Sequence, residues 1–69
     1  MQLSARNQIR GTVTGVTFGE ATANVTLDAN GVRLVASITV EAARELGLAE
    51  GRGVIAVIKA SDVIVAVPD

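Results

Sequence analysis

An Asn-Gly pair flanked by alternating apolar and polar residues is the feature that most constrains how this chain folds. Residues 21–29 carry Ala, Val or Leu at every second position, and residues 32–39 continue this period of two beyond Asn30-Gly31. The period is that of a strand with one buried face. Asn-Gly strongly predicts a hairpin, because a type I′ turn needs positive φ at both central residues. The predicted cross-strand pairs are Val25 with Ala36, Leu27 with Leu34, and Asp28 with Arg33.

Residues 9–18 form the preceding segment and also read as a strand, although their alternation is imperfect. Gly11 and Gly15 inside it predict bends or bulges, as in a tightly curled barrel. Gly19-Glu20 predicts the turn that leads into the next strand. Together with the hairpin, these residues predict three consecutive strands.

Residues 40–46 predict one short helix. Thr39 suits the N-cap position, where its hydroxyl can accept a hydrogen bond from a free helix N–H. Gly47 suits the end of the helix, where a left-handed residue is common. Leu46 and Leu48 flank this glycine, and we expect both to be buried beneath the helix.

Two apolar segments close the chain, residues 54–58 and residues 63–67. The second, Val-Ile-Val-Ala-Val, is apolar on both faces of a strand. A chain of 69 residues is too small to cover both faces by itself, and an exposed strand of this kind would aggregate. We therefore expect one face or edge of residues 63–67 to meet another subunit. Pro68, which has no N–H, ends the strand.

The apolar residues are mainly Val and Ala, so a lone subunit should be marginally stable. The absence of Cys excludes a disulfide, and the absence of His as well makes a zinc staple a poor alternative. Oligomerisation is the remaining way to stabilise so small a subunit. The sequence thus predicts one domain over residues 1–69, mainly β: a small, OB-like five-stranded barrel with one short helix, in an oligomer.

Charge and composition disfavour several functions. The net charge is −1 and Phe18 is the one aromatic residue, whereas nucleic-acid binders present a basic face and aromatic platforms. There is no His or Cys, no paired carboxylates and no phosphate-binding glycine motif, so we predict that the chain is not an enzyme. It has neither a signal-peptide pattern nor an apolar run of membrane-spanning length. A cytoplasmic location, with no membrane partner, is expected by default.

Two short polar runs indicate the chemistry that remains. Ser4-Ala5-Arg6-Asn7-Gln8 precedes the first strand, and Lys59-Ala60-Ser61 follows the fourth. Each run places a hydroxyl two residues from a cation, and both groups donate hydrogen bonds as a tetrahedral oxyanion requires. Each run also has a purely structural interpretation: Arg6 can be a solvated surface cation, and Lys59 can protect an edge strand from aggregation.

Together and in this order, the two runs resemble the Mop family of small molybdate-binding domains, the molbindins. The resemblance extends over nearly the whole chain and includes Gly11-Thr12-Val13, Ser37-Ile38-Thr39, Glu45-Leu46-Gly47-Leu48 and Val57-Ile58-Lys59-Ala60-Ser61. It implies an OB-like fold and a homo-hexamer, built as a trimer of dimers, that stores molybdate or tungstate between subunits without an organic cofactor. The oxyanion-binding residues that it implies are Ser4, Ala5, Arg6, Thr39, Lys59, Ala60 and Ser61. The family has serine three residues after this threonine, and here that position is Ala42.

Two alternatives to storage stay open. Related domains are appended to molybdate transport ATPases and molybdate-responsive regulators, so the chain can instead be a regulatory module that docks to a partner when the oxyanion binds. Residues 38–41, 43–48 and 50–51 also resemble the core of the AbrB-like DNA-binding family, although the acidic charge balance disfavours DNA.

Overall fold

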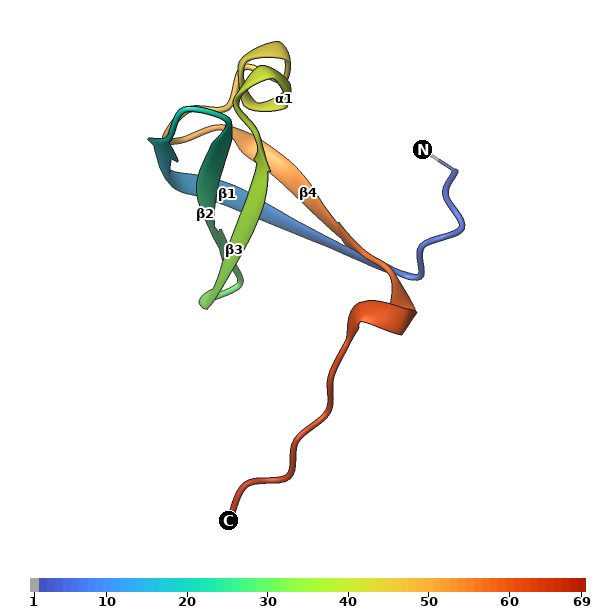
Figure 1. Ribbon diagram of the computed structural model, residues 1–69. Coiled ribbons are helices and arrows are strands. Elements are labelled where there is room, and N and C mark those ends of the chain that lie inside the picture. The colour runs from blue at the N-terminus through green and yellow to red at the C-terminus, as the bar shows by residue number, and fades with distance from the viewer. Residues whose placement is uncertain (1) are drawn as a thin grey trace.

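A computed structural model describes residues 2–69. Its centre is a four-stranded antiparallel sheet in the order β3-β2-β1-β4, with a short helix after β3 (Figure 1). The elements are β1 Asn7–Phe18, β2 Thr22–Ala29, β3 Val32–Thr39, α1 Val40–Glu45, β4 Gly53–Ile58 and the 3₁₀ turn η1 Ala60–Asp62. The mainly β class and the single short helix agree with the sequence prediction.

The β2–β3 hairpin has the predicted turn and register. Asn30 has a φ of 53° and Gly31 a φ of 85°, as a type I′ turn requires. Leu27 pairs with Leu34, and Asp28 pairs with Arg33. Local turn chemistry and side-chain alternation therefore determine this half of the sheet.

Strand β1 is central and joins the hairpin to β4. The β1–β2 register shifts between Val13 and Gly15, where the hydroxyl of Thr14 donates to the Thr26 carbonyl at 3.2 Å. This irregularity is the expected bulge. Gly11 is needed for a different reason: a Cβ at that position would lie 2.8 Å from the Asp28 carbonyl oxygen, closer than real Cβ atoms come. The sheet can curl tightly here because β1 lacks side chains at these points.

The core is small and lies on one face of the sheet. Its buried residues come from β1, β2 and α1, and are Val13, Ala23, Val25, Leu27, Ala29 and Ala43. The apolar side chains of β3 and β4 are only half-buried against this cluster. The core is therefore covered well in the middle of the sheet and poorly at its two edge strands.

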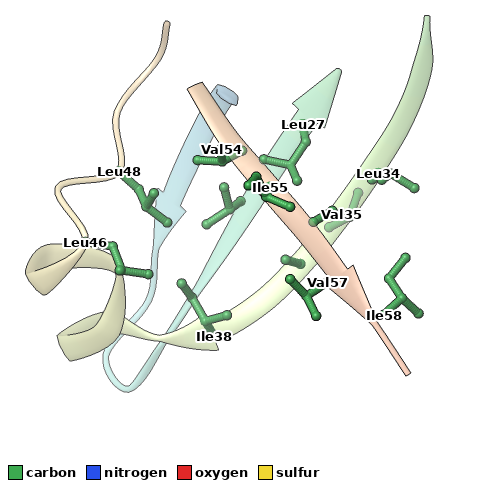
Figure 2. A pocket seen from close by; sticks show the side chains of 13 residues that line it. Leu27, Leu34, Val35, Ile38, Leu46, Leu48, Val54, Ile55, Val57 and Ile58 are labelled. Carbon is green, nitrogen blue, oxygen red and sulfur yellow. The ribbon is translucent and has the colours of Figure 1, made fainter. Parts of the chain in front are cut away.

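An apolar groove of about 280 Å³ lies between the edge strands β3 and β4. Its lining comes from β2, β3, β4 and residues 46–48, and Figure 2 shows side chains of these elements gathered around the space. Leu46 was expected to be buried, but it is 59% exposed because it lines this groove. Within residues 2–69 the sheet is therefore an open structure of four strands.

The apolar segment of residues 63–67 differs from the predicted fifth strand. It is extended, but it pairs with no strand in the part of the chain that the structure describes, and it leads away from the sheet (Figure 1). Ile64 is 93% exposed and Val67 is 87% exposed. The pattern of the segment is that of a strand, and one copy of the chain provides no place for it.

The close approach at Gly11 predicts the effect of adding a methyl group there. Gly11→Ala should lower the free energy of unfolding by roughly 1–3 kcal/mol, because the new Cβ must displace backbone of β2. Gly53→Ala is the matched control, since its Cβ would meet nothing within 4 Å. Urea unfolding at one protein concentration measures both. Equal stability of the two variants would contradict the packing argument.

Candidate functional site

The two polar runs meet at one end of the sheet. The β1–β4 ladder ends with the pair Asn7 and Ile58, so Arg6 and Lys59 are the next residues outward on adjacent strands. We call this region the polar end, and its residues are Ser4, Ala5, Arg6, Lys59, Ala60 and Ser61. Antiparallel pairing thus brings Arg6 beside Lys59, although they come from opposite ends of the chain, and Figure 1 shows the remainder of the two runs leading away from this point in different directions.

Two amide side chains stabilise this arrangement. Asn7 donates from Nδ2 to the Ile58 carbonyl at 3.1 Å and ties the last residues of the two strands together. Gln8 donates from Nε2 to the Ala5 carbonyl at 3.3 Å and bends the N-terminal run back on itself. Sequence reasoning assigned no role to either amide, because the partners of both are backbone atoms whose positions only the fold determines.

The run at residues 59–61 is shaped by the turn η1. The N–H of Asp62 donates to the Lys59 carbonyl at 2.9 Å, and that of Val63 donates to the Ala60 carbonyl at 3.3 Å. The first N–H groups of a helical turn have no acceptor within the turn. The backbone N–H groups of Ala60 and Ser61 therefore have no acceptor within the turn, and Lys59, Ala60 and Ser61 are all exposed.

The polar end carries a local excess of positive charge. Arg6 and Lys59 supply two cations, and Asp62 supplies one carboxylate. The whole chain has a net charge of −1, so it will not attract an anion over long distances. Charges farther apart than about 10 Å are screened in ordinary salt, so the local excess decides what binds. The polar end suits a small anion that accepts hydrogen bonds.

Thr39, the seventh predicted residue, lies at the other end of the sheet. It pairs with Thr22, on the side where Phe18 of β1 pairs with Ala23. Eleven residue steps along β1, at about 3.3 Å each, separate that end from Asn7, a length of at most roughly 36 Å along a strand that bends at the bulge, and Figure 1 shows the junction of β3 and α1 far from the end of β4. Thr39 and the polar end therefore cannot bind the same small anion within one copy of the chain.

The Thr39 hydroxyl already has a structural role. It accepts a hydrogen bond at 3.0 Å from the N–H of Ala42 and so caps α1. The N–H of Val40 donates to the Ala21 carbonyl, also at 3.0 Å. Where the family has a serine hydroxyl to donate to an oxyanion, this chain has only the backbone N–H of Ala42. That N–H already donates to the Thr39 hydroxyl, so it is not free to bind an anion.

The surroundings of Thr39 are acidic. It lines a shallow hollow with the carboxylates of Glu20, Glu41 and Glu45 and the single guanidinium of Arg44. Arg44 also lies over the Phe18 ring, 5.7 Å from its centroid. Three carboxylates against one cation disfavour a dianion, so this hollow differs in charge from the polar end.

Other kinds of site find little support among residues 2–69. This part of the chain contains no group of three or more His, Cys, Asp or Glu side chains that could hold a metal ion. No helix in it is long and apolar enough to cross a membrane.

Residues 3–65 match the model of the TOBE domain. Molybdenum-pterin-binding protein 1 of Clostridium pasteurianum is 42% identical over 66 residues, which are 94% of this chain and 97% of that protein. Molybdenum-pterin-binding protein MopA of Rhodobacter capsulatus is 49% identical over 67 residues, which are 96% of this chain and 25% of that protein. The names of both relatives describe binding proteins.

Solved structures agree closely with this fold. A molybdate-binding protein from Sporomusa ovata superposes with a TM-score of 0.92 at 35% identity, covering 96% of this chain and 98% of that one. The protein ModG, described as cytoplasmic and solved with molybdate bound, has a TM-score of 0.85 at 44% identity, over 87% of this chain and 43% of that one. The predicted OB-like molbindin architecture is confirmed by these likenesses.

The capping bond of Thr39 predicts a loss of stability that is independent of any ligand. Thr39→Ala should lower the free energy of unfolding by about 1 kcal/mol, because the Ala42 N–H loses its acceptor. Thr39→Ser keeps the hydroxyl and should be close to the parent protein. Urea unfolding without added oxyanion measures both variants. If Thr39→Ala is as stable as Thr39→Ser, the hydroxyl does not stabilise the helix.

Proposed function

Because this chain belongs to the TOBE domain family and is of the Mop type, we propose that it binds molybdate or tungstate and stores it in the cytoplasm. The observation that carries the proposal is the polar end, where Arg6 and Lys59 follow the last pair of the β1–β4 ladder and each has a serine two residues away along the chain. The protein buffers the intact oxyanion and catalyses no reaction on it.

Each proposed ligand residue acts as a hydrogen-bond donor. Arg6 presents its planar fork to two oxygens of the tetrahedral anion, and Lys59 supplies a compact charge beside it. Ser4 and Ser61 donate from their hydroxyls, and Ala5 and Ala60 from their backbone N–H groups. Molybdate accepts hydrogen bonds and donates none, so a site made only of donors matches it.

The bound species is the bare oxyanion, with no organic cofactor. A pterin ring needs a flat stacking surface, and the single aromatic side chain, Phe18, lies at the opposite end of β1 from the polar end. Nucleic acid is not a partner either, because the two cations of the polar end are too few for a phosphate-binding face.

The oxyanion is held between subunits of a hexamer built as a trimer of dimers. Support for shared sites comes from exposure: Ser4, Arg6, Lys59 and Ser61 are all open to solvent in one copy. A dianion bound there would keep much of its hydration, and a second copy can replace that water with further donors. Thr39 contributes to a separate site, which needs cations from another copy to offset the three nearby carboxylates.

Native mass spectrometry tests assembly and ligand together. The protein should be a hexamer that gains several molybdate masses from dilute molybdate and few sulfate masses at the same concentration. The larger oxyanion is favoured if the spacing of the donors is fixed by the assembly. The mass gained also distinguishes the bare oxyanion from a pterin complex. A dimer that binds neither anion would contradict the proposal.

Lys59 provides the sharpest test of the ligand set. Lys59→Ala should weaken molybdate binding roughly tenfold to a hundredfold, since a hydrogen bond to a charged group contributes about 1.5–3 kcal/mol. Arg52→Ala is the control, because Arg52 is an exposed cation in the loop before β4, at the other end of that strand. Isothermal titration gives both affinities, and the assembly state should be unchanged. Equal affinities would show that Lys59 is only a solvated edge residue.

A further inference from the structure

We propose that Asn30, at the tip of the β2–β3 hairpin, is a site of spontaneous deamidation and isoaspartate formation, and that the closed turn controls the rate of this reaction. The reaction joins the Asn30 side chain to the Gly31 nitrogen and needs no enzyme or bound ligand. It is argued from the turn alone and does not depend on the proposed function. The two residues that specify the hairpin therefore also limit its chemical lifetime.

The chemistry follows from two groups that are adjacent in the sequence, and asparagine is among the thermally labile residues of proteins. The Gly31 nitrogen attacks Cγ of Asn30, a new N–Cγ bond forms, and the amide C–N bond breaks. The proton of the attacking nitrogen leaves with the amide as ammonia, and no electrons are gained or lost. Water then opens the five-membered imide at either carbonyl. One opening gives aspartate, and the other gives isoaspartate, whose main chain is longer by one methylene.

The residue that follows each asparagine distinguishes Asn30 from the other two. Asn30 is followed by Gly31, which has no Cβ to hinder the approach of its nitrogen to Cγ. Asn7 and Asn24 are each followed by a residue with a side chain, which is a β-branched valine after Asn24. Asn7 also donates from Nδ2 to a backbone carbonyl, and Asn24 lies within the β2 ladder. Asn30 is therefore the asparagine from which we expect ammonia to be lost.

The surrounding structure shields neither of the reacting groups. Asn30 and Gly31 are both exposed, and Figure 1 shows the tip at the opposite end of the hairpin from α1. Within residues 2–69 the Asn30 side chain makes no hydrogen bond, and the Gly31 N–H has no acceptor. A Cβ built on Gly31 would meet nothing within 4 Å, so the space around this residue is open. Water therefore has free access to the imide.

The conformation of the closed turn, by contrast, opposes ring closure. Asn30 has a φ of 53°, and a type I′ turn gives this residue a ψ of about 30°. At that ψ the Gly31 nitrogen points away from the Asn30 Cβ, whereas the ring needs both on the same side of the Cα–C bond. This bond must therefore rotate through more than a right angle before the nitrogen can reach Cγ.

The rotation requires the hairpin tip to open. Ala29 and Val32 form the last pair of the β2–β3 ladder, directly beside the turn. There the small Ala29 side chain is buried and Val32 is 58% exposed, so little packing holds the pair closed. Such ends open at a lower free energy than the middle of a sheet. The overall rate is therefore the rate in the open tip multiplied by the fraction of time that the tip is open.

The two products have different consequences for the hairpin. Aspartate tolerates the left-handed conformation of position 30, so the turn can close again. Isoaspartate adds a methylene to the main chain, and a two-residue loop cannot hold it without loss of the pairing between Ala29 and Val32. Deamidation therefore divides the protein into a fraction with an intact hairpin and a fraction whose tip stays open.

Prolonged incubation of the purified protein in native buffer and in concentrated urea tests the proposal. Peptide mass spectrometry should show the amide of Asn30 becoming an acid in both, several-fold more slowly in native buffer, while Asn7 and Asn24 stay intact there. Fragmentation should identify both aspartate and isoaspartate at position 30. Asn30→Gly is the matched control, because Gly-Gly also suits a type I′ turn but has no side-chain amide. After incubation the isoaspartate fraction of the parent should unfold at lower urea than fresh protein, and Asn30→Gly should be unchanged.

Other outcomes overturn the proposal. If the amide of Asn30 persists in native buffer for a period in which the urea-treated chain converts completely, the folded protein has no modification site there. Equal rates in buffer and in urea would show that the turn does not control the reaction. An equal loss of stability in Asn30→Gly would place the damage at another residue. None of these measurements uses molybdate, so a failure of the proposed function would leave their result unchanged.

Discussion

The structure depends on one packing constraint: the buried core is too small to cover the apolar side chains of the whole sheet. Val and Ala dominate the apolar residues, and the buried core consists of small side chains in the middle strands. Such a core cannot reach the edges of a curled sheet, so β3 and β4 keep half-exposed apolar faces on either side of the groove. The elements described within residues 2–69 include no further layer that covers them. The segment at residues 63–67 is a second apolar surface that this small core leaves exposed.

Strand β1 connects this packing problem to the site. It pairs with β4 from Asn7 to Thr12 and with β2 of the hairpin from Thr12 to Phe18, and the bulge between Val13 and Gly15 lies within the second of these regions. The pairing with β4 brings the N-terminal polar run beside residues 59–61, and the Asn7 side chain holds the last rung of that ladder. Curling of the sheet, opening of the groove and assembly of the polar end therefore all depend on the same strand.

The two ends of the sheet show why local charge matters more than total charge. At one end, two cations stand against one carboxylate, and at the other, one cation stands against three. The net charge of −1 averages over this difference and describes neither end. Thr39 illustrates the consequence, because its hydroxyl caps a helix within an acidic hollow. A threonine implied as a ligand by resemblance has, in one copy, the contacts of a structural residue.

The amino-acid sequence by itself determined the elements whose causes are local. Alternation and the Asn30-Gly31 turn specified the hairpin and its register, Thr39 and Gly47 delimited the helix, and Gly15 marked the bulge. It also specified the residue types of the polar end, because donor chemistry is readable from side chains alone. Only the tertiary structure decided that Arg6 and Lys59 are neighbours while Thr39 lies a strand's length away, since β1–β4 pairing joins residues 51 positions apart. It likewise left Leu46 exposed and residues 63–67 unpaired, because burial there depends on surface that one copy of the chain does not have.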